Sequence, residues 1–450
     1  MESSSSSDQV KNVDWISKLP DDVLLVILSR LSTEEAIRTS IVSKRWEHAW
    51  KQMSHLVLDM QRLIDDKEPL DSSIRAATLL TKVLNNHNGH LESCVIDHFS
   101  YHGTNGMLNA WIRLSTCVKH TKSLTLTHHF DSLERTKAFN VLSDCFSHPS
   151  LTSLSLQGYI LDTSHCFNNC QNLKTLKLHF IMGLEVGVFN RVLAFCPSLQ
   201  VLVLHVTCFK RCTGGPLKIE NKKLKIFQVL SCKDIVGFRV SAPCLDILAI
   251  RNTSFSRDGL VLTSPRLHEF NRISWRNKPH ISYNISKERK SIVHEEFVNI
   301  CGELLMETPS LSVSVDLMNP TEVERLRQVL RLWTCKMNEL EILFKNNNAH
   351  REEEEEEYSS QKKLWEDNNN EDPFPNAEFR VDTVWMHNFS GSEEEFALAS
   401  RLIRQGTVVK QMMIKTTSFP ARKKLEIETA VAKLQTLQRK DQWELTIECF

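Results

Sequence analysis

Apolar residues in the stretch 19–31 recur at steps of one, three and four positions, the spacing that places side chains along one side of a helix. Pro20 suits the first helical position. Asp21 and Asp22 follow it and put negative charge near the helix N-terminus, where the backbone dipole favours it. The pattern therefore predicts an amphipathic helix that begins at the proline.

Two further short helices are predicted directly after the first. Ser32 and Glu35 have the spacing of a capping box, in which each side chain satisfies a backbone N–H at the start of a helix. The apolar face continues through a third helix at Ile37, Ile41, Val42 and Trp46. Because about thirty residues are too few to close a core of their own, part of this apolar surface needs a partner.

The sequence of this stretch resembles a known module. LPDDVLLVIL and AIRTSIVSKRW, followed by Trp50, are similar to the F-box of plant proteins that also carry leucine-rich repeats, with Ser32 where the family usually has proline. The resemblance implies that the module binds a Skp-type adaptor, which joins it to a cullin and RING ubiquitin ligase. Carried over by position, the contact or supporting residues are Leu19, Pro20, Val23, Ile27, Leu28, Ile37, Val42 and Trp46. The alternative is a helical cap on the repeats that follow.

A second pattern, L-x-x-L-x-L, returns along the middle of the chain. Clear copies lie at 151–156, 173–178 and 199–204, and degenerate copies at 53–58, 91–96, 224–229 and 245–250. From the first clear copy to the last degenerate one, successive starts differ by 22, 26, 25 and 21 residues, which fits leucine-rich repeats. Since one repeat cannot bury its leucines alone, stacked copies are expected to form a continuous parallel sheet inside an arc, with helices or turns outside.

Strand and helix patterns continue beyond Leu267. Strands are predicted at 312–317 and 340–344, with a helix at 320–333 between them. The stretch 346–376 contains a run of six glutamates and two asparagine runs, and it has almost nothing to bury, so it predicts a disordered loop. Such an acidic run either binds a basic partner or serves as a solvated linker, and the linker interpretation is favoured.

The last segment resembles a second known region. Ser392 and Glu395 repeat the capping-box pattern, Gly406 supplies a helix stop, and a strand at 408–414 and a helix at 422–439 follow. Trp443, Leu445, Ile447 and Cys449 alternate with polar residues as in a final strand. VWMHNFSGSEEEFALASRLIRQG and KQMMI resemble the FBD region of plant F-box and leucine-rich-repeat proteins.

These patterns predict an α/β fold. An N-terminal three-helix F-box precedes a leucine-rich-repeat solenoid with parallel strands, which an FBD-like strand and helix segment closes. The expected domains are a disordered N-terminus at 1–14, the F-box at 15–60, leucine-rich repeats at 61–345, the disordered loop at 346–376 and the FBD-like region at 377–450.

Composition excludes several classes of partner. The 55 basic and 55 acidic residues cancel, which gives no global electrostatic basis for binding nucleic acid or an anionic membrane. No apolar run approaches the roughly 20 residues that span a bilayer. The 13 cysteines follow no disulfide framework and no apolar signal segment precedes them, so reduced thiols in the nucleus or cytoplasm are expected.

No arrangement typical of catalysis is visible. Phosphate-binding glycine motifs are missing, and the sequence around His294 falls short of a zinc-protease motif. Two cysteine pairs with a nearby histidine are possible metal ligands. Small buried cysteines are, however, common in repeat turns, so a packing role is favoured. These pairs are Cys166 and Cys170 beside His165, and Cys208 and Cys212 beside His205. We therefore expect no cofactor and no enzyme activity.

The repeats are expected to offer a binding surface instead. Side chains alternate along a strand, so residues between the leucines point to the concave face. The candidates for binding an unknown protein substrate are Lys177, His179, Val201, Val203, His205, Ile226, Leu230, Ile247 and Arg251, an apolar strip with polar margins. The alternative is that a loop or the C-terminal region covers this strip.

The function expected from these features is substrate recruitment to a ubiquitin ligase, without catalysis by this chain. One rival is a small-molecule-dependent co-receptor of the same architecture, which needs basic and aromatic residues on the concave face. The other is an interaction scaffold outside any ligase. A test of adaptor binding distinguishes this scaffold from a ligase subunit.

Overall fold

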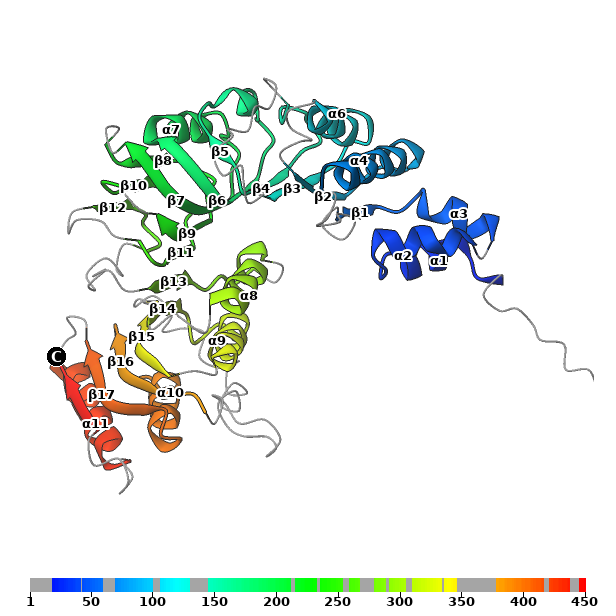
Figure 1. Cartoon of the computed structure of the whole chain (residues 1–450). Helices are drawn as coiled ribbons and strands as arrows, with labels where there is room; N and C mark the ends of the chain where they lie inside the picture. Colours follow the sequence, from blue (N-terminus) through cyan, green and yellow to red (C-terminus); the bar gives the residue numbers. More distant parts are fainter. Residues whose placement is uncertain are drawn as a thin grey trace, which may run out of the picture. The chain divides into compact units, whose positions relative to one another are not determined.

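The computed structural model describes residues 18–41, 43–59, 69–99, 106–129, 145–211, 215–232, 235–253, 259–267, 279–288, 291–304, 310–333, 336–345, 378–416, 421–437 and 445–450. The chain folds into two compact units, residues 1–159 with 165–172 and residues 160–164 with 173–450 (Figure 1). The predicted fold class is confirmed, because N-terminal helices precede the parallel strands of a leucine-rich-repeat solenoid. The predicted disordered segments 1–14 and 346–376 lie outside the described residues.

The N-terminal elements are α1 (Asp21–Leu28), α2 (Thr33–Arg38), the 3-10 turn η2 (Thr39–Ile41) and α3 (Lys44–Trp50). The capping box of α2 is confirmed, since Ser32 and Glu35 each accept the other's backbone N–H. Pro20 is the N-cap of α1 rather than its first helical residue, which corrects the predicted start. Their core consists of Leu24, Leu28, Ala36, Trp46, Trp50 and Met53, joined by Val83 of α4 (Pro69–Asn86).

Two hydrogen bonds hold these helices to the repeats of the first unit. The Val57 N–H on β1 (His55–Leu58) donates to Thr33 Oγ1 at 2.7 Å, so α2 covers the edge of that strand. Nε2 of the buried His87, which follows α4, lies 2.7 Å from the Met53 carbonyl oxygen. The helical module is therefore fixed at two places on the first repeats.

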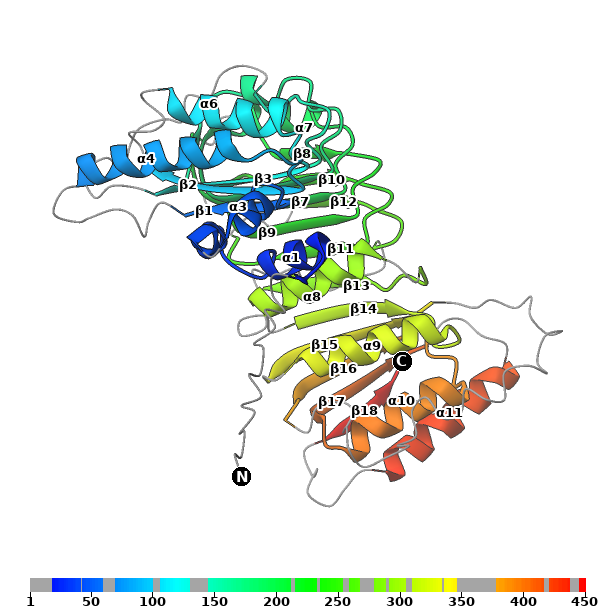
Figure 2. The same cartoon turned by 90° about the vertical axis from the view of Figure 1, so that its right-hand side faces the viewer.

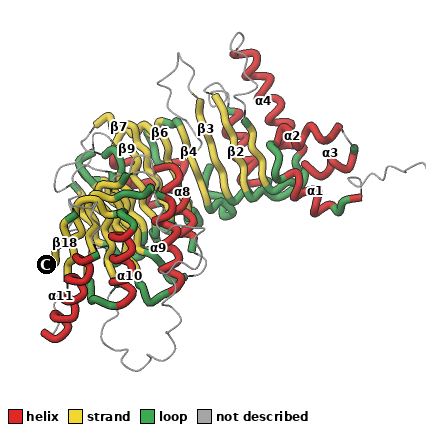
Figure 3. The backbone as a smooth tube through the Cα atoms, turned by 90° about the horizontal axis from the view of Figure 1, so that it is seen from below, coloured by secondary structure: helices red, strands yellow, loops and turns green. Residues whose placement is uncertain are grey.

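Parallel strands build the rest of the first unit. β1 is followed by β2 (Ser93–Phe99), β3 (Ser123–His129) and β4 (Ser153–Gln157), which Figure 3 shows side by side. The connections include α6 (Met107–Arg113), the π-helical turn η4 (Leu114–Val118) and the 3-10 turn η5 (His165–Phe167). The sequence pattern missed β3, because Thr121 replaces the first leucine of that repeat and bonds the Ser115 carbonyl instead.

The second unit begins with four more parallel strands of the same kind. These are β6 (Thr175–Glu185), β7 (Val201–Arg211), β9 (Ile226–Cys232) and β11 (Ile247–Ile250), with β5 (Ile160–Leu161) beside β6 and helix α7 (Val186–Ala194) between β6 and β7. A separate parallel sheet is formed by β8 (Leu217–Glu220), β10 (Phe238–Ser241) and β12 (Leu260–Thr263). The predicted strands at 173–178, 199–204, 224–229 and 245–250 are confirmed.

The strand direction then reverses. β13 (His280–Asn284) pairs antiparallel with β11, and the remaining strands run parallel to β13. They are β14 (Ser310–Val315), β15 (Met337–Phe344), β16 (Val381–His387), β17 (Val408–Lys415) and β18 (Thr446–Cys449), joined by α8 (Ile292–Leu304), α9 (Pro320–Leu332), α10 (Glu393–Arg404) and α11 (Ala421–Thr436). The expected continuous parallel sheet is thus interrupted at one step.

This reversal decides which face of the sheet the helices cover. β-α-β connections are almost always right-handed, and after β13 the strands keep advancing across the sheet in the same direction. With the strands reversed, a right-handed connection has to place its helix on the opposite face. Figure 2 shows α9 over β15 and β16. Tyr283 on β13 belongs to the same core and lies opposite Ile247 in the register of β11 and β13. The helices therefore cover the face that carries Ile247.

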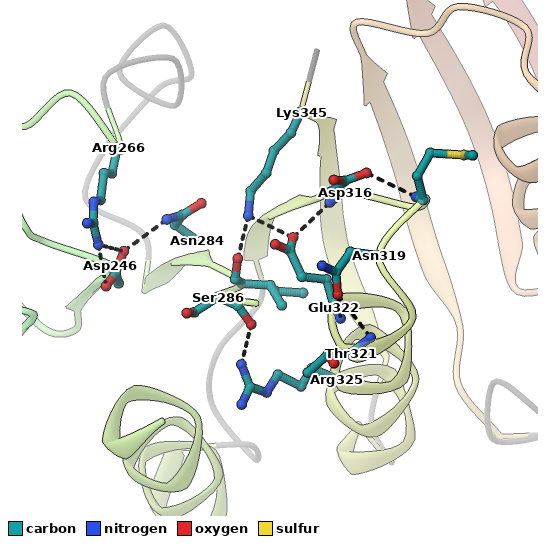
Figure 4. Close-up of polar contacts among 12 residues, drawn as sticks. Asp246, Arg266, Asn284, Ser286, Asp316, Asn319, Thr321, Glu322, Arg325 and Lys345 are labelled. Atoms are coloured by element: carbon teal, nitrogen blue, oxygen red, sulfur yellow. Dashed lines mark hydrogen bonds and ion pairs between the residues drawn. The ribbon is translucent and has the colours of Figure 1, made fainter. Parts of the chain in front are cut away.

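Buried polar contacts hold the reversed segment in place (Figure 4). The Asp246 carboxylate, directly before β11, accepts two hydrogen bonds from Arg266 Nη1 at 2.8 and 2.9 Å and one from Asn284 Nδ2 at 2.9 Å. Farther along, Glu322 Oε2 lies 2.7 Å from Lys345 Nζ, which also donates to the carbonyl of Ile285 after β13. The carboxyl end of β13 is thereby fixed by contacts from two sides.

The C-terminal segment follows the predicted order. The capping box of Ser392 and Glu395 starts α10, and Gly406 ends it with a φ of +68°. Burial raises the pKa of Glu395, although its carboxylate accepts the N–H groups of Ser390, Gly391 and Ser392. The predicted last strand is confirmed at β18, while Trp443 lies outside the described residues. Within the described ranges no helix is long and apolar enough to cross a bilayer.

Candidate interaction surfaces

The N-terminal helices present an apolar face to solvent. Leu24 and Leu28 of α1 are fully buried in the small core, whereas Val23, Val26 and Ile27 on its other side are 39, 60 and 37 % exposed. Ile41 in η2 is 89 % exposed. A helix as short as α1 needs only one buried stripe, so this second apolar surface indicates a site for a partner protein. We call Val23, Val26, Ile27 and Ile41 the outer apolar face.

The predicted adaptor residues divide into three groups. Pro20, Val23 and Ile27 are exposed, Leu19 and Ile37 are half-buried, and Leu28 and Trp46 belong to the core, where they can only support the face. Val42 lies outside the described residues. Ile41 was predicted on the apolar face but not among the adaptor contacts, and Val26 was predicted in neither group, although α1 carries more apolar residues than its buried stripe requires. Their role in binding the adaptor stays a prediction.

Charged groups border the outer apolar face. Arg45 of α3 bonds Asp21 Oδ1 at 2.7 Å and also donates to the Leu19 carbonyl, which fastens the start of α1 to α3. Arg38 and Glu34 form an exposed pair at 2.6 Å on α2. Exposed ion pairs contribute little to stability, typically below about 1 kcal/mol. The contacts of Arg45 instead orient α1 against α3.

The apolar strip predicted on the repeats is buried. Val201, Val203, Ile226 and Ile247 are at most 4 % exposed, and Leu230 is half-buried. Helix α8 lies over this face: Phe297 stacks on Tyr283 with ring centroids 4.3 Å apart, and Glu296 pairs with Lys177 of β6. The expectation of an exposed apolar strip is therefore wrong, and its cover is neither a loop nor the C-terminal region but helix α8, within the segment predicted as repeats. The reversal at β13 is the physical reason.

The polar members of the predicted surface lie together beyond the covered strip. Lys177 and His179 belong to β6, His205 to β7, and Arg251 follows β11, and all four side chains are partly exposed. Burial, followed by the charges of His205 and Lys177, lowers the pKa of His179 to about 4. Burial and Arg251 lower the pKa of His205. Both imidazoles are therefore neutral at physiological pH.

The suggested metal ligands do not gather. Among the described residues, no three His, Cys, Asp or Glu side chains lie together as metal ligands. Cys166 and Cys170 are buried, and the Cys170 thiol donates to the Phe146 carbonyl at 3.3 Å, which fits a packing role. The side chains of Cys208 and Cys212 lie outside the described residues.

Taken together, a helical docking module and a leucine-rich-repeat solenoid define a protein-interaction protein, and comparison with known proteins gives its family. Residues 16–58 match the model of the F-box domain, and residues 108–275 match the model described as FBD-associated F-box protein At5g56370, LRR repeats. The chain belongs to the plant F-box and leucine-rich-repeat proteins, which confirms the predicted family.

Three relatives support this assignment, two of them over nearly the whole chain. F-box protein At1g80960 of Arabidopsis thaliana is 64 % identical over 99 % of this chain and 91 % of the relative. F-box protein At3g60790 of the same species is 44 % identical over 97 % of this chain and 90 % of the relative. F-box/FBD/LRR-repeat protein At2g04230, also from Arabidopsis thaliana, is 34 % identical over 43 % of each.

Proposed function

We propose that this chain is the substrate-recognition subunit of an SCF-type ubiquitin ligase that works in the nucleus or cytoplasm. Its F-box docks a Skp-type adaptor, which joins it to a cullin and a RING protein, and its repeats hold the protein to be ubiquitinated. The observation that carries the proposal is the outer apolar face on an F-box whose own core is already closed by Leu24, Leu28 and Trp46.

The energetics favour a partner on this face. An exposed apolar side chain loses contact with water when a partner covers it, and each fully covered valine or isoleucine contributes about 1.5 to 3 kcal/mol. The face lies on α1 and η2, away from the contacts of Thr33 and His87 that hold the module to the repeats. An adaptor can therefore bind without disturbing the joint.

The proposed role requires no chemistry from this chain. A ligase subunit of this kind contributes by holding the substrate near the charged ubiquitin carrier, which turns an encounter between two molecules into a local reaction. The fixed joint between F-box and first repeats suits this task, because a loose joint would lower the effective concentration of the substrate.

A pull-down with a purified Skp-type adaptor and cullin tests the proposal. The variant Val26→Asp with Ile27→Asp places two charges on the outer apolar face, and we expect adaptor binding to fall at least tenfold. Leu28 is avoided because it is fully buried and its replacement would unfold the module. The matched control is Leu79→Asp on α4, where the leucine is 50 % exposed outside the F-box.

Circular dichroism establishes that both variants are folded. Binding that the control keeps and the double variant loses supports the docking role. An intact chain that fails to bind any Skp-type adaptor excludes the ligase function and leaves the F-box as a cap on the repeats.

A further inference from the structure

We propose that Lys177, His179, Phe180, His205 and Arg251, here called the cationic rim, bind an acidic segment of the substrate protein that also presents an apolar side chain. This inference rests on the proposed function, since it names the class of substrate that the repeats take. The rim lies entirely within the second unit.

The strand register brings the rim together. Lys177 on β6 pairs with Val203 on β7, Val203 with Gln228 on β9, and Gln228 with Ala249 on β11. His205 and Arg251 lie two residues beyond Val203 and Ala249, toward the carboxyl ends of their strands. Because alternate residues of parallel strands share a face, these side chains gather at one edge of the covered strip.

Two bulges aim the rim residues. The register of β6 against β7 shifts between Leu178 and Ile181, and the register of β7 against β9 shifts between Leu204 and His205. Bulges redirect side chains and are frequent beside functional sites. The first of them contains His179 and Phe180, and the second has its extra residue, Leu230, on β9 beside His205. The irregular backbone and the polar cluster thus coincide.

Phe180 supplies an exposed aromatic surface. Its φ is +51°, a left-handed conformation that is unusual for a bulky residue, and its side chain is 51 % exposed. The ring lies against His205, with centroids 4.2 Å apart. This strained backbone leaves about half of the ring open to solvent beside His205, where a partner can contact it.

The charges of the rim select an anion. Lys177 and Arg251 are cations, and Glu296 lies 3.3 Å from Lys177. The neutral imidazoles of His179 and His205 offer N–H donors. Beneath them, the Gln228 side chain is 2 % exposed, and its Nε2 atom has no hydrogen-bond partner among the described residues. A carboxylate beside Arg251 finds several donors, whereas a cation meets repulsion.

The size of the rim favours a peptide carboxylate over nucleic acid. The rim has only two permanent cations, and the whole chain has a net charge of zero. The rim therefore offers no extended row of positive charges for a phosphate backbone. Phe180 lies on β6 and Arg251 follows β11, three strand spacings or about 14 Å away, so an apolar side chain at Phe180 and an acidic one at Arg251 match residues about four positions apart in one extended segment.

Selection of random displayed peptides on the intact chain tests the inference. We expect the selected peptides to share an aspartate or glutamate and a large apolar residue about four positions away from it. Fluorescence anisotropy with a selected peptide should show binding weakened at least tenfold by Arg251→Glu and severalfold by Phe180→Ala. The matched control is Arg239→Glu on β10, an exposed arginine outside the rim.

Selected peptides without acidic residues, or unchanged binding by the folded Arg251→Glu variant, overturn the inference. A selection that enriches no sequence also counts against it. The adaptor pull-down reports on a different face, so the two failures are distinguishable: Arg251→Glu should keep adaptor binding, and the Val26 and Ile27 double variant should keep peptide binding.

Discussion

Glu296 Oε2 lies 3.3 Å from Lys177 Nζ, although 119 residues separate the two in the chain. This pair joins α8 to β6 across the face that the repeats would otherwise leave open. It exists because the strands reverse at β13 and carry their helices to the opposite side of the sheet. The reversal thus converts a predicted binding surface into core, and it leaves only the margin of that surface for partners.

Removing the aromatic side chain that covers the strip should open it. Phe297→Ala deletes a fully buried ring stacked on Tyr283, and we expect a loss of about 3 to 5 kcal/mol in the free energy of unfolding. Amide hydrogen exchange should rise in β7 and β9. Val298→Ala, on the same helix at a position 37 % exposed, is the control and should change little. Equal effects of both variants would contradict the covering role of α8.

Loss of the Asp246 carboxylate, the hydrogen-bond acceptor before β11, should lower the free energy of unfolding. Asp246→Ala leaves the donors of Arg266 and Asn284 unpaired, and we expect it to cost about 2 to 3 kcal/mol. Asp246→Asn keeps one oxygen for Asn284 and should cost less. Thermal unfolding of the two variants measures the difference. If alanine is tolerated as well as asparagine, these contacts do not hold β13.

The joint between F-box and repeats should weaken when its buried histidine is replaced. His87→Leu leaves the Met53 carbonyl without its partner at 2.7 Å, and we expect a loss of about 1 to 3 kcal/mol. Hydrogen exchange should increase around Met53 and β1. His90→Leu replaces an exposed histidine three residues later and serves as the control. Unchanged exchange in the His87 variant would show that Thr33 and the backbone contacts suffice.

Acid should destabilise the second unit through His280. Burial lowers the pKa of His280 from its usual value near 6.5 to about 4, while the charge of Glu341 opposes this shift. Between these two pH values the unfolded chain binds a proton that the folded chain does not. The contribution of the neutral His280 to the free energy of unfolding is therefore complete above about pH 6.5 and decreases as the pH drops toward 4. At pH 5 the loss is about 2 kcal/mol.

Urea unfolding of the wild type and of His280→Gln at pH 7 and pH 5 measures this contribution. The variant should show a smaller loss between the two pH values, because glutamine does not titrate. His87, His179 and His205, whose pKa values burial also lowers, add losses of the same sign. A pH dependence that is identical in wild type and variant would contradict the assignment to His280.

Local signals were read correctly from the sequence. The capping boxes at Ser32 and Ser392 depend on residues three positions apart, and both are present. The leucine spacing located most repeat strands, since each copy contains its own buried positions. The strand β3 was not predicted because Thr121 occupies the position of the first leucine. The strand β13 was not predicted because its buried residues do not follow the repeat pattern.

Tertiary structure decided which apolar residues remain exposed. Val23 and Leu24 are neighbours on α1, yet the first is 39 % exposed and the second fully buried, because only one side of the helix meets α3. Val201 and Val203 have the pattern of an exposed strip, but α8 covers them. Periodicity reveals that a residue faces one side of an element, and it carries no information about what packs on that side.

By itself, the sequence determined the F-box, the repeat strands and the family, because these follow from contacts within about thirty residues of chain. The antiparallel pairing of β11 with β13, the burial of Ile247 under α8 and the gathering of the cationic rim were decided only in three dimensions. Their physical cause is a single long-range choice, the direction of β13, which through right-handed connections fixes the side taken by every later helix.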